Sequence, residues 1–357
     1  MIVRNPWYPE VDPVIRNSLR QEGLHLAGIT SVHDNVEEEE EQYRRWLGRG
    51  YHGAMRWMEK HAALKFHPER LLPGTRSIVF IALNYYQKRT DAPPEPSGRL
   101  ARYAWGRDYH KELGKRIKRV ARQLQEQFPD EQFRSWTDAT PLAERFYAER
   151  AGIGFTGRHT LLINGQFGSW FVVGEILTTI ALDPSESAGT HHGACPLNCT
   201  RCIDVCPTGA LLGPHRIDGS RCISYLTIEH RGVIPEELRP LMGDWIFGCD
   251  LCQEVCPLNV RATVTDVAGF LKPIAGDRQL LKDILEIRTE EEFRSRFAGS
   301  PVMRAGREGL VRNACIAAAN LGARELIEEL KICADDGNEV VAIHARWALS
   351  QLESTDE

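Results

Sequence analysis

Seven of the ten cysteines in this chain lie in two short runs, and an eighth, Cys222, lies alone between them. The first run reads Cys195-Pro-Leu-Asn-Cys199-Thr-Arg-Cys202-Ile-Asp-Val-Cys206-Pro207, and the second reads Cys249-Asp-Leu-Cys252-Gln-Glu-Val-Cys256-Pro257. Runs of the form C-x2-C-x3-C-P are typical of proteins that hold a pair of [4Fe–4S] clusters, each bound by four thiolates. The spacing therefore predicts a ferredoxin-like module with two clusters.

The last cysteine of each run normally ligates the cluster of the other run. This crossover predicts one cluster held by Cys195, Cys199, Cys202 and Cys256, and a second held by Cys206, Cys222, Cys249 and Cys252. Cys222 has to take part, because the second run supplies only two ligands to its own cluster. Three residues separate Cys195 from Cys199 where the ferredoxin run has two, so Cys195 is the least regular ligand.

Two other uses of cysteine fit this pattern less well. Zinc sites favour C-x2-C pairs a dozen or more residues apart, without the C-x3-C-P ending. A disulfide framework requires export, and the sequence shows no sign of export. Cys315 and Cys333 lie in apolar helical sequence and are expected to be buried thiols.

The composition is that of a soluble globular protein. The chain has 357 residues, 42% hydrophobic and 26% charged, which suggests two or three domains. Its first residues contain no apolar signal region or twin-arginine pair, and the longest apolar runs are too short to span a bilayer. Together with oxygen-sensitive clusters, these features predict a cytoplasmic protein without membrane contact, and we expect a monomer.

Alternating helix and strand signals predict an α+β or α/β fold for residues 1–185, with a strand over Ser77–Tyr85, a Pro-rich loop over Asp91–Gly98 and a hairpin over 161–173. Residues 186–262 would form the cluster domain and 263–299 a connecting segment. Residues 300–357 contain three amphipathic helical stretches (Arg312–Leu321, Glu325–Ala334 and Glu339–Leu352) separated by glycines, which suggests a HEAT-like tail.

Basic residues concentrate between Gly98 and Arg122, where Lys111, Lys115, Lys118, Arg119 and Arg122 share one face of a predicted helix. Such a stripe can neutralise phosphates, and it can equally be the solvated face of an amphipathic helix. Arg304, Arg307 and Arg312 leave the same choice open between RNA contact and surface solvation.

Two loops have ambiguous chemistry. Gly152, Gly154 and Gly157 have the spacing of a dinucleotide loop, but they follow a helix and precede a strand, which excludes NAD binding and still allows close approach to a large ligand. Asp138 precedes a Pro-led helix signal and is locally most typical of a helix N-cap. Alternatively, a desolvated pocket could make it a proton donor.

Taken together, these segments resemble the epoxyqueuosine reductase family, cobalamin-dependent iron–sulfur enzymes of queuosine biosynthesis related to reductive dehalogenases. The resemblance covers nearly the whole chain. It is carried by 71–78, 82–85, Arg102-Tyr-Ala-Trp-Gly-Arg-Asp-Tyr-His110, Asp138 with Glu144-Arg145, 148–154, 161–164, both cysteine runs, 221–227 and 309–314. After Asp138 the family usually has Thr-Gly, where this chain has Ala139 and Thr140, so contacts made by those two positions are expected to differ.

The resemblance implies a fold that binds base-off cobalamin beside the two-cluster module. It implies reduction of the epoxide of epoxyqueuosine to queuosine at the wobble position of tRNA, with electrons from an external donor and Asp138 as the general acid. This role replaces the N-cap interpretation. The implied cobalamin-pocket residues are Lys65, Tyr109, His110, Arg145, Thr156, Leu161 and Asn164.

Three alternatives remain open at this stage. The first is a corrinoid reductive dehalogenase-like enzyme with another substrate, although exported members carry the twin-arginine signal that is absent here. The second is an electron carrier, which would not need some 180 residues before its clusters. The third is a tRNA-binding accessory protein with structural clusters.

Overall fold

The computed structural model describes residues 13–24, 26–32, 35–90, 95–184 and 193–353. Residues 91–94 of the expected Pro-rich loop and the expected domain boundary at 185/186 lie outside these ranges. Within them, no helix is long and apolar enough to cross a membrane.

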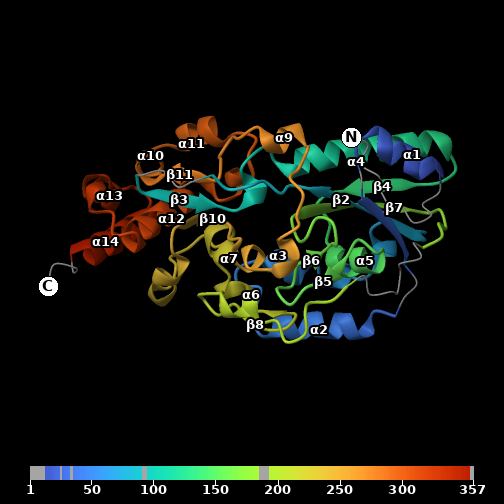
Figure 1. The fold of residues 1–357 in the computed structure, drawn as a ribbon, viewed down its shortest axis with the longest axis horizontal. Coiled ribbons are helices and arrows are strands. Elements are labelled where there is room, and N and C mark those ends of the chain that lie inside the picture. Colours follow the sequence, from blue (N-terminus) through green and yellow to red (C-terminus); the bar gives the residue numbers. More distant parts are fainter. Residues whose placement is uncertain (1–12, 25, 33–34, 91–94, 185–192, 354–357) are drawn as a thin grey trace.

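A four-stranded antiparallel sheet forms the N-terminal half of the molecule (Figure 1). Its order is β1 (Leu26–Ser31), β2 (Ser77–Asn84), β7 (Phe171–Thr178) and β4 (Phe133–Trp136). The strand predicted over Ser77–Tyr85 is therefore confirmed. Both faces of β2 are buried, because its alternate side chains enter two different hydrophobic cores.

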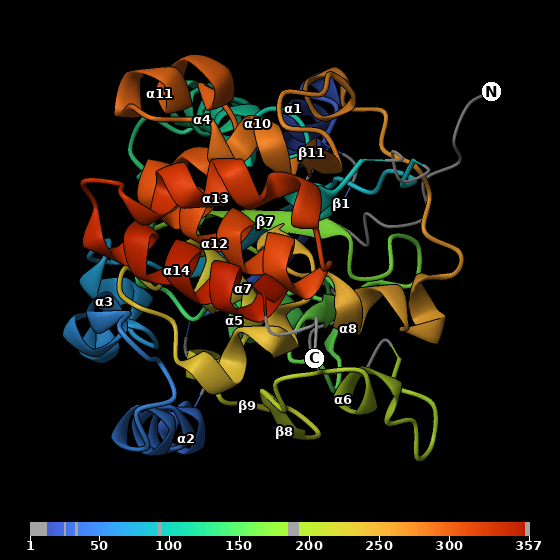
Figure 2. The ribbon, with the colours of Figure 1, turned by 90° about the vertical axis from the view of Figure 1, so that its left-hand side faces the viewer.

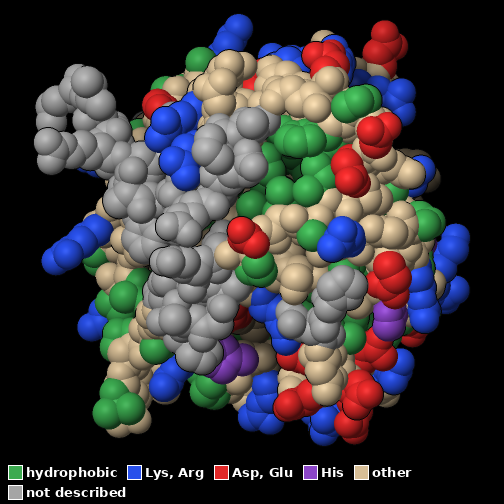
Figure 3. Space-filling view, turned by 90° about the vertical axis from the view of Figure 1, so that its right-hand side faces the viewer, with side chains coloured by type: hydrophobic (Ala, Val, Ile, Leu, Met, Phe, Trp, Pro, Cys, Tyr) green, Lys and Arg blue, Asp and Glu red, His purple; other side chains and the backbone are tan. Residues whose placement is uncertain are grey.

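Helices cover the two faces of this sheet (Figure 1). One face packs against α1 (Pro13–Gln21) and α4 (Tyr109–Gln127), whose Leu113, Ile117, Val120 and Leu124 are all fully buried as the apolar pattern predicts. The other face packs against α5 (Glu144–Arg150). The basic side chains that were predicted to share one face of the α4 helix are exposed, and Arg119 among them pairs with Glu22. Figure 3, which views the end of the molecule carrying α1 and α4, shows basic side chains interspersed with acidic ones.

The hairpin predicted over 161–173 is wrong. β6 (Leu162–Ile163) pairs with β5 (Phe155–Thr156), whereas β7 joins the large sheet. Only a single bridge, between Asn164 and Gly168, connects the two arms. The glycines after α5 serve this packing: a Cβ on Gly154 would lie 2.3 Å from the Ile163 carbonyl oxygen.

A second sheet joins distant parts of the chain. β3 (Ser97–Leu100) lies between the parallel strand β10 (Trp245–Phe247) and the antiparallel strand β11 (Arg278–Leu280). The sequence patterns did not predict β3. The cluster segment beside this sheet consists of short elements, which are α6 (Arg201–Asp204), β8 (Leu211–Gly213), β9 (Arg216–Ile217), α7 (Ile223–Ile228) and α8 (Leu251–Glu254).

The α-helices after residue 265 form the C-terminal part of the molecule, and Figure 2 shows several of them stacked toward the viewer. They are α9 (Ala268–Leu271), α10 (Leu281–Leu285), α11 (Glu290–Phe297), α12 (Gly306–Asn320), α13 (Ile327–Ala334) and α14 (Glu339–Glu353). The three predicted tail helices are present as α12–α14. One hydrophobic core joins them to β3 and β10, so these helices pack against the second sheet. α2 (Glu37–Gly48) and α3 (Arg56–Lys60) lie beside the cluster segment, because the Trp46 indole of α2 donates to the carbonyl oxygen of Ile217 and Met55, next to α3, packs against the core that contains α7.

Candidate active site

Asp138 lies on the loop between β4 and α5, and its side chain is 56% exposed. Its φ of 50° is in the left-handed region, which aspartate adopts more readily than most residues. The N-cap interpretation is wrong, because α5 begins at Glu144 and Ala143 is the capping residue. Asp138 is therefore not needed to start a helix, and its carboxylate is available for other contacts.

Two side chains from the start of α4 contact that carboxylate. The Tyr109 hydroxyl donates a hydrogen bond to Oδ2 of Asp138, and Nε2 of His110 lies 3.7 Å from the same oxygen. Asp108 caps α4 through the backbone N–H of His110, and its Oδ1 also lies 2.7 Å from Nδ1 of that histidine. This hydrogen bond to Asp108 raises the pKa of His110, against the opposing effect of burial.

Lys65 and Arg145 lie near Glu144. The Lys65 ammonium lies 5.5 Å from the centre of the Tyr43 ring, and burial lowers the pKa of this lysine while Glu144 opposes the shift. Arg145 donates to the carbonyl oxygen of Thr160 and lines a cavity of about 320 Å³.

Four of the cysteines also line this cavity, whereas Asp138, Tyr109, His110 and Lys65 do not. Its walls include Arg145, His159 and Leu161 on one side. The cysteines that line it are Cys206, Cys222, Cys249 and Cys252. Nε2 of His159 is buried without a hydrogen-bond partner among the described residues, and burial lowers the pKa of this imidazole to about 4. A neutral ring with an unsatisfied nitrogen borders a space that a ligand could enter.

Thr156 and Asn164 do not line the cavity. Asn164 is buried, its Nδ2 donates to the carbonyl oxygen of Ile153, and its Oδ1 accepts from the backbone N–H of Gln166. The Thr156 hydroxyl donates to Glu149. Of the residues predicted from the family pocket, the structure thus brings Tyr109 and His110 to Asp138 and Arg145 and Leu161 to the cavity.

The seven cysteines of the two runs and Cys222 lie in two neighbouring groups. Burial raises the pKa of the Cys256 thiol, as do the nearby Cys195 and Cys199, and Cys202 is influenced in turn by Cys195 and Cys256. In the other group, burial raises the pKa of the Cys252 thiol well above its usual range, and Cys222 and Cys206 act in the same direction, as does Cys202 of the first group. No three Cys, His, Asp or Glu side chains of the described residues are grouped as ligands of a single metal ion. As expected, Cys315 and Cys333 are fully buried.

Comparison with known proteins identifies the family. A model described as "Epoxyqueuosine reductase QueG, DUF1730" matches residues 65–139, and a "4Fe-4S double cluster binding domain" matches residues 195–259. The epoxyqueuosine reductase of Xanthomonas campestris pv. campestris is 38% identical over 343 residues, covering 94% of this chain and 95% of that protein. The epoxyqueuosine reductase of Escherichia coli (strain K12) is 36% identical over 349 residues, covering 94% and 89%.

The chain belongs to the epoxyqueuosine reductase family. Two solved structures agree with this assignment. A crystal structure of epoxyqueuosine reductase with an epoxyqueuosine-modified tRNA-Tyr stem loop matches with a TM-score of 0.85 at 29% identity, covering 95% of this chain and 89% of that one. A Bacillus subtilis epoxyqueuosine reductase, with its catalytic aspartate loop swung out of the active site, matches with the same TM-score and coverage at 30% identity. The resemblance inferred from the sequence is confirmed, and the chain is an oxidoreductase with a segment for two [4Fe–4S] clusters.

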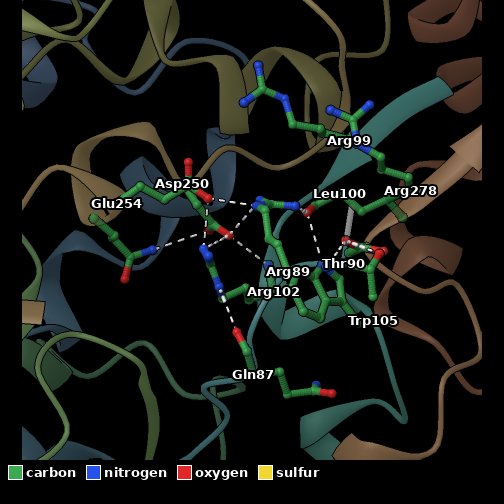
Figure 4. A network of polar contacts seen from close by, with 12 residues as sticks. Gln87, Arg89, Thr90, Arg99, Leu100, Arg102, Trp105, Asp250, Glu254 and Arg278 are labelled. Carbon is green, nitrogen blue, oxygen red and sulfur yellow. Dashed lines mark hydrogen bonds and ion pairs between the residues drawn. The ribbon is translucent and has the colours of Figure 1, made fainter. Parts of the chain in front are cut away.

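In this family member, a network of charges joins the second cysteine run to the segment around β3 (Figure 4). Asp250, between Cys249 and Cys252, is 1% exposed. Its Oδ2 accepts a 2.8 Å hydrogen bond from the backbone N–H of Arg102 and lies 3.3 Å from Nη1 of that arginine. Arg89 Nη2 lies 3.4 Å from the same oxygen. Burial raises the pKa of Asp250 to about 6, although Arg102 and Arg89 oppose the shift.

The arginines near the C-terminal helices have different roles. Arg312, expected on the surface, is 1% exposed and donates to the carbonyl oxygens of Leu226, His230 and Gly232, so an RNA contact by Arg312 is excluded in this fold. Arg307 pairs with Asp336. Arg304 remains 56% exposed and pairs with Glu229; this hydrogen bond raises the pKa of Arg304, and Asp138 and Tyr109 act in the same direction.

Sequence reasoning missed one acidic residue of this site. Glu175 lies in the middle of the apolar strand β7, is fully buried and accepts a 2.9 Å hydrogen bond from the Thr140 hydroxyl. A single acidic residue within an otherwise apolar strand was the available signal, because burial of an unpaired carboxylate is costly.

Proposed function

We propose that this chain reduces the epoxide of epoxyqueuosine in tRNA to the alkene of queuosine, with Asp138 as proton donor. The observation that carries the proposal is the placement of Asp138. Its carboxyl group is solvent-accessible, accepts a hydrogen bond from Tyr109 and lies 3.7 Å from His110. The fold around it matches that of an epoxyqueuosine reductase over 95% of this chain. A proton delivered to the epoxide oxygen allows that oxygen to leave.

We assign the cluster ligands by the crossover rule. Cys195, Cys199, Cys202 and Cys256 would hold one cluster, and Cys206, Cys222, Cys249 and Cys252 the other. The nearby Cys195 and Cys199 raise the pKa of Cys256, and Cys222 and Cys206 raise the pKa of Cys252, which supports this division. Cys202 also acts on Cys252, so the two groups lie close enough to each other for electron transfer between them to be short.

The cofactor we propose beside the clusters is base-off cobalamin. The unpartnered His159 nitrogen and the second cysteine group border the same cavity, so a cofactor bound there would lie against the cluster ligands. Of the pocket residues that the family resemblance implies, Arg145 and Leu161 line this cavity and would contribute to holding the cofactor. When bound, a corrinoid supplies a strongly reducing metal centre. The chain's own residues then exclude water, orient the epoxide and keep the proton at Asp138.

The tRNA would approach from the side on which Asp138 is exposed. Trp57 is 43% exposed, and the Arg304 guanidinium lies 5.4 Å from the centre of its ring. Unstacked bases of an RNA loop are commonly bound by aromatic rings and arginine planes. The exposed lysines of α4 begin beside His110 at Lys111 and would contact phosphates farther from the wobble base.

The remaining parts of the proposal concern partners. An external electron donor would approach the first cluster, where Cys256 lines a surface hollow of about 600 Å³ together with Val205 and Val260. We propose that the protein works as a cytoplasmic monomer and that its C-terminal helices form a HEAT-like unit.

Anaerobic turnover tests the proposal. Reconstituted protein, cobalamin and a chemical reductant are mixed with epoxyqueuosine-bearing tRNA, and the nucleosides are analysed by mass spectrometry. The proposal predicts loss of one oxygen that depends on cobalamin. No conversion by protein with both clusters and corrinoid bound would refute it and favour a corrinoid reductase with another substrate.

A further inference from the structure

Two carboxyl groups meet beneath the Asp138 loop. Glu175 extends from the centre of β7, where its backbone pairs with Phe80 and Trp136, and its side chain is fully buried. Glu144 is the first residue of α5. The two carboxyl groups are within hydrogen-bonding reach of each other, and Glu144 also neighbours the backbone amide of Asp138.

The hydrogen bonds around this pair are incomplete. Oε1 of Glu175 accepts from the Thr140 hydroxyl at 2.9 Å. Oε2 of Glu175 and Oε1 of Glu144 are buried and have no hydrogen-bond donor among the described residues. Buried oxygen atoms are rarely left without a donor. One proton held between the two carboxyl groups would satisfy both atoms.

The charges nearby favour that proton. Burial raises the pKa of Glu175 to about 8, with Asp138 acting in the same direction and Thr140 and Glu144 opposing it. Burial also raises the pKa of Glu144 well above its usual range, as do Glu175 and Asp138, whereas Lys65 opposes the shift. Arg145, the next residue along α5, is the other cation that faces Glu144. Two carboxyl groups this close cannot both ionise cheaply, which favours a proton shared between them.

The reaction needs more protons than Asp138 carries. Converting an epoxide to an alkene breaks two carbon–oxygen bonds, forms the second carbon–carbon bond and releases the oxygen as water. This change consumes two electrons and two protons. The electrons come from the external donor through the clusters, and Asp138 holds a single proton.

We propose that Glu144 and Glu175 share a proton and pass it to Asp138 once Asp138 has protonated the epoxide oxygen. This inference rests on the proposed function. Both glutamates border the Asp138 loop, because Glu144 neighbours the backbone amide of Asp138 and Glu175 accepts a hydrogen bond from Thr140 of the same loop. Lys65 lies near both Glu144 and Asp138 and offsets the additional negative charge until solvent returns the proton. Both glutamates act through Asp138 and are positioning residues.

The test uses Glu175→Gln and Glu144→Gln in the reconstituted holoenzyme. The amide keeps the shape and replaces the shared proton as a hydrogen-bond donor, but it cannot release a proton. We expect kcat to fall about tenfold or more, with KM for the tRNA unchanged. The loss of wild-type activity as pH rises through about 8 should be absent from the variants.

Glu131→Gln is the matched control, because Glu131 also accepts a hydrogen bond from a threonine, Thr179. Glu131 is not among the groups that shift the pKa of Glu144 or Glu175. It should keep the wild-type pH profile. Infrared spectroscopy of the wild-type holoenzyme provides a reading that survives poor folding of a variant: a protonated carboxyl band is expected at neutral pH.

The outcomes separate this inference from the proposed function. Wild-type protein that fails to convert the tRNA refutes the function. An active wild type whose glutamine variants keep its kcat and pH profile refutes the shared-proton role alone, as does a wild-type infrared spectrum without a protonated carboxyl at neutral pH.

Discussion

Replacing Arg102 with methionine tests whether the charge network of Figure 4 holds the second cysteine run in place. Arg102 is 8% exposed, and its guanidinium lies 3.3 Å from Asp250 and 2.9 Å from Glu254. The Arg102 guanidinium lies 4.5 Å from the centre of the Trp170 ring, and the apolar methionine side chain keeps part of this contact. The variant therefore mainly removes the charge.

The expected cost follows from the burial of Asp250. Removing one partner of a buried ion pair typically costs about 3–5 kcal/mol, because the other charge stays buried. Arg89 remains 3.4 Å from Asp250, so we expect the lower end of this range, about 3 kcal/mol or roughly a hundredfold in the folding equilibrium. Arg294→Met is the control: Arg294 is 68% exposed in an i,i+4 pair, and its loss should cost less than about 0.5 kcal/mol.

Anaerobic urea unfolding of the holoprotein measures this difference, with tryptophan fluorescence for the fold and visible absorbance for the clusters. We expect Arg102→Met to lower the urea midpoint and to release iron at lower urea than the wild type. A change no larger than that of Arg294→Met, with iron retained equally well, would show that the network does not support the cluster module.

Four further predictions concern stability, clusters and RNA. Arg312→Met leaves three buried carbonyls without their donor and should destabilise the protein by several kcal/mol in urea unfolding; a change below about 1 kcal/mol would contradict its burial. Arg304→Ala should weaken tRNA binding by about 1 kcal/mol in a filter-binding assay with iron content unchanged, and unaltered affinity would exclude the proposed contact. Cys222→Ser should leave one cluster by iron analysis, and retention of two would remove Cys222 from the ligand set. The folded-state pKa of Glu175 lies above its usual 4.5, so stability should fall as pH rises from about 4.5 to about 8, and Glu175→Gln should flatten this decline; an equal slope would argue against a protonated Glu175.

The sequence predicted the elements whose burial shows directly in their hydrophobic pattern. The strand at Ser77 and the apolar face of α4 follow directly from burial against the sheet. The hairpin failed because β6 and β7 pair with different strands, and local alternation does not contain that information. β3 was missed because its four residues gain their order from β10 and β11, which lie far away in the chain.

Site residues that belong to a spaced motif could be predicted from the sequence. Residues whose role depends on three-dimensional packing could not. Spacing alone singled out the cysteines. Local sequence gave Asp138 the wrong role, because the position at which α5 begins depends on packing after Leu142. Arg312 appeared as a surface charge because helical sequence does not reveal which carbonyls a long side chain will meet. The role proposed for Glu175 depends on Glu144, which lies thirty-one positions earlier in the chain.

The measurement that tests the central claim most directly is anaerobic turnover of epoxyqueuosine-bearing tRNA by Asp138→Asn, beside wild type and the exposed-loop control Asp130→Asn. Iron, bound corrinoid and tRNA affinity are determined on the same preparations. We predict that Asp138→Asn loses about a hundredfold or more in kcat with all three unchanged, while the control is fully active. Wild-type turnover by Asp138→Asn would contradict the account, because the epoxide oxygen would then receive its proton from another group.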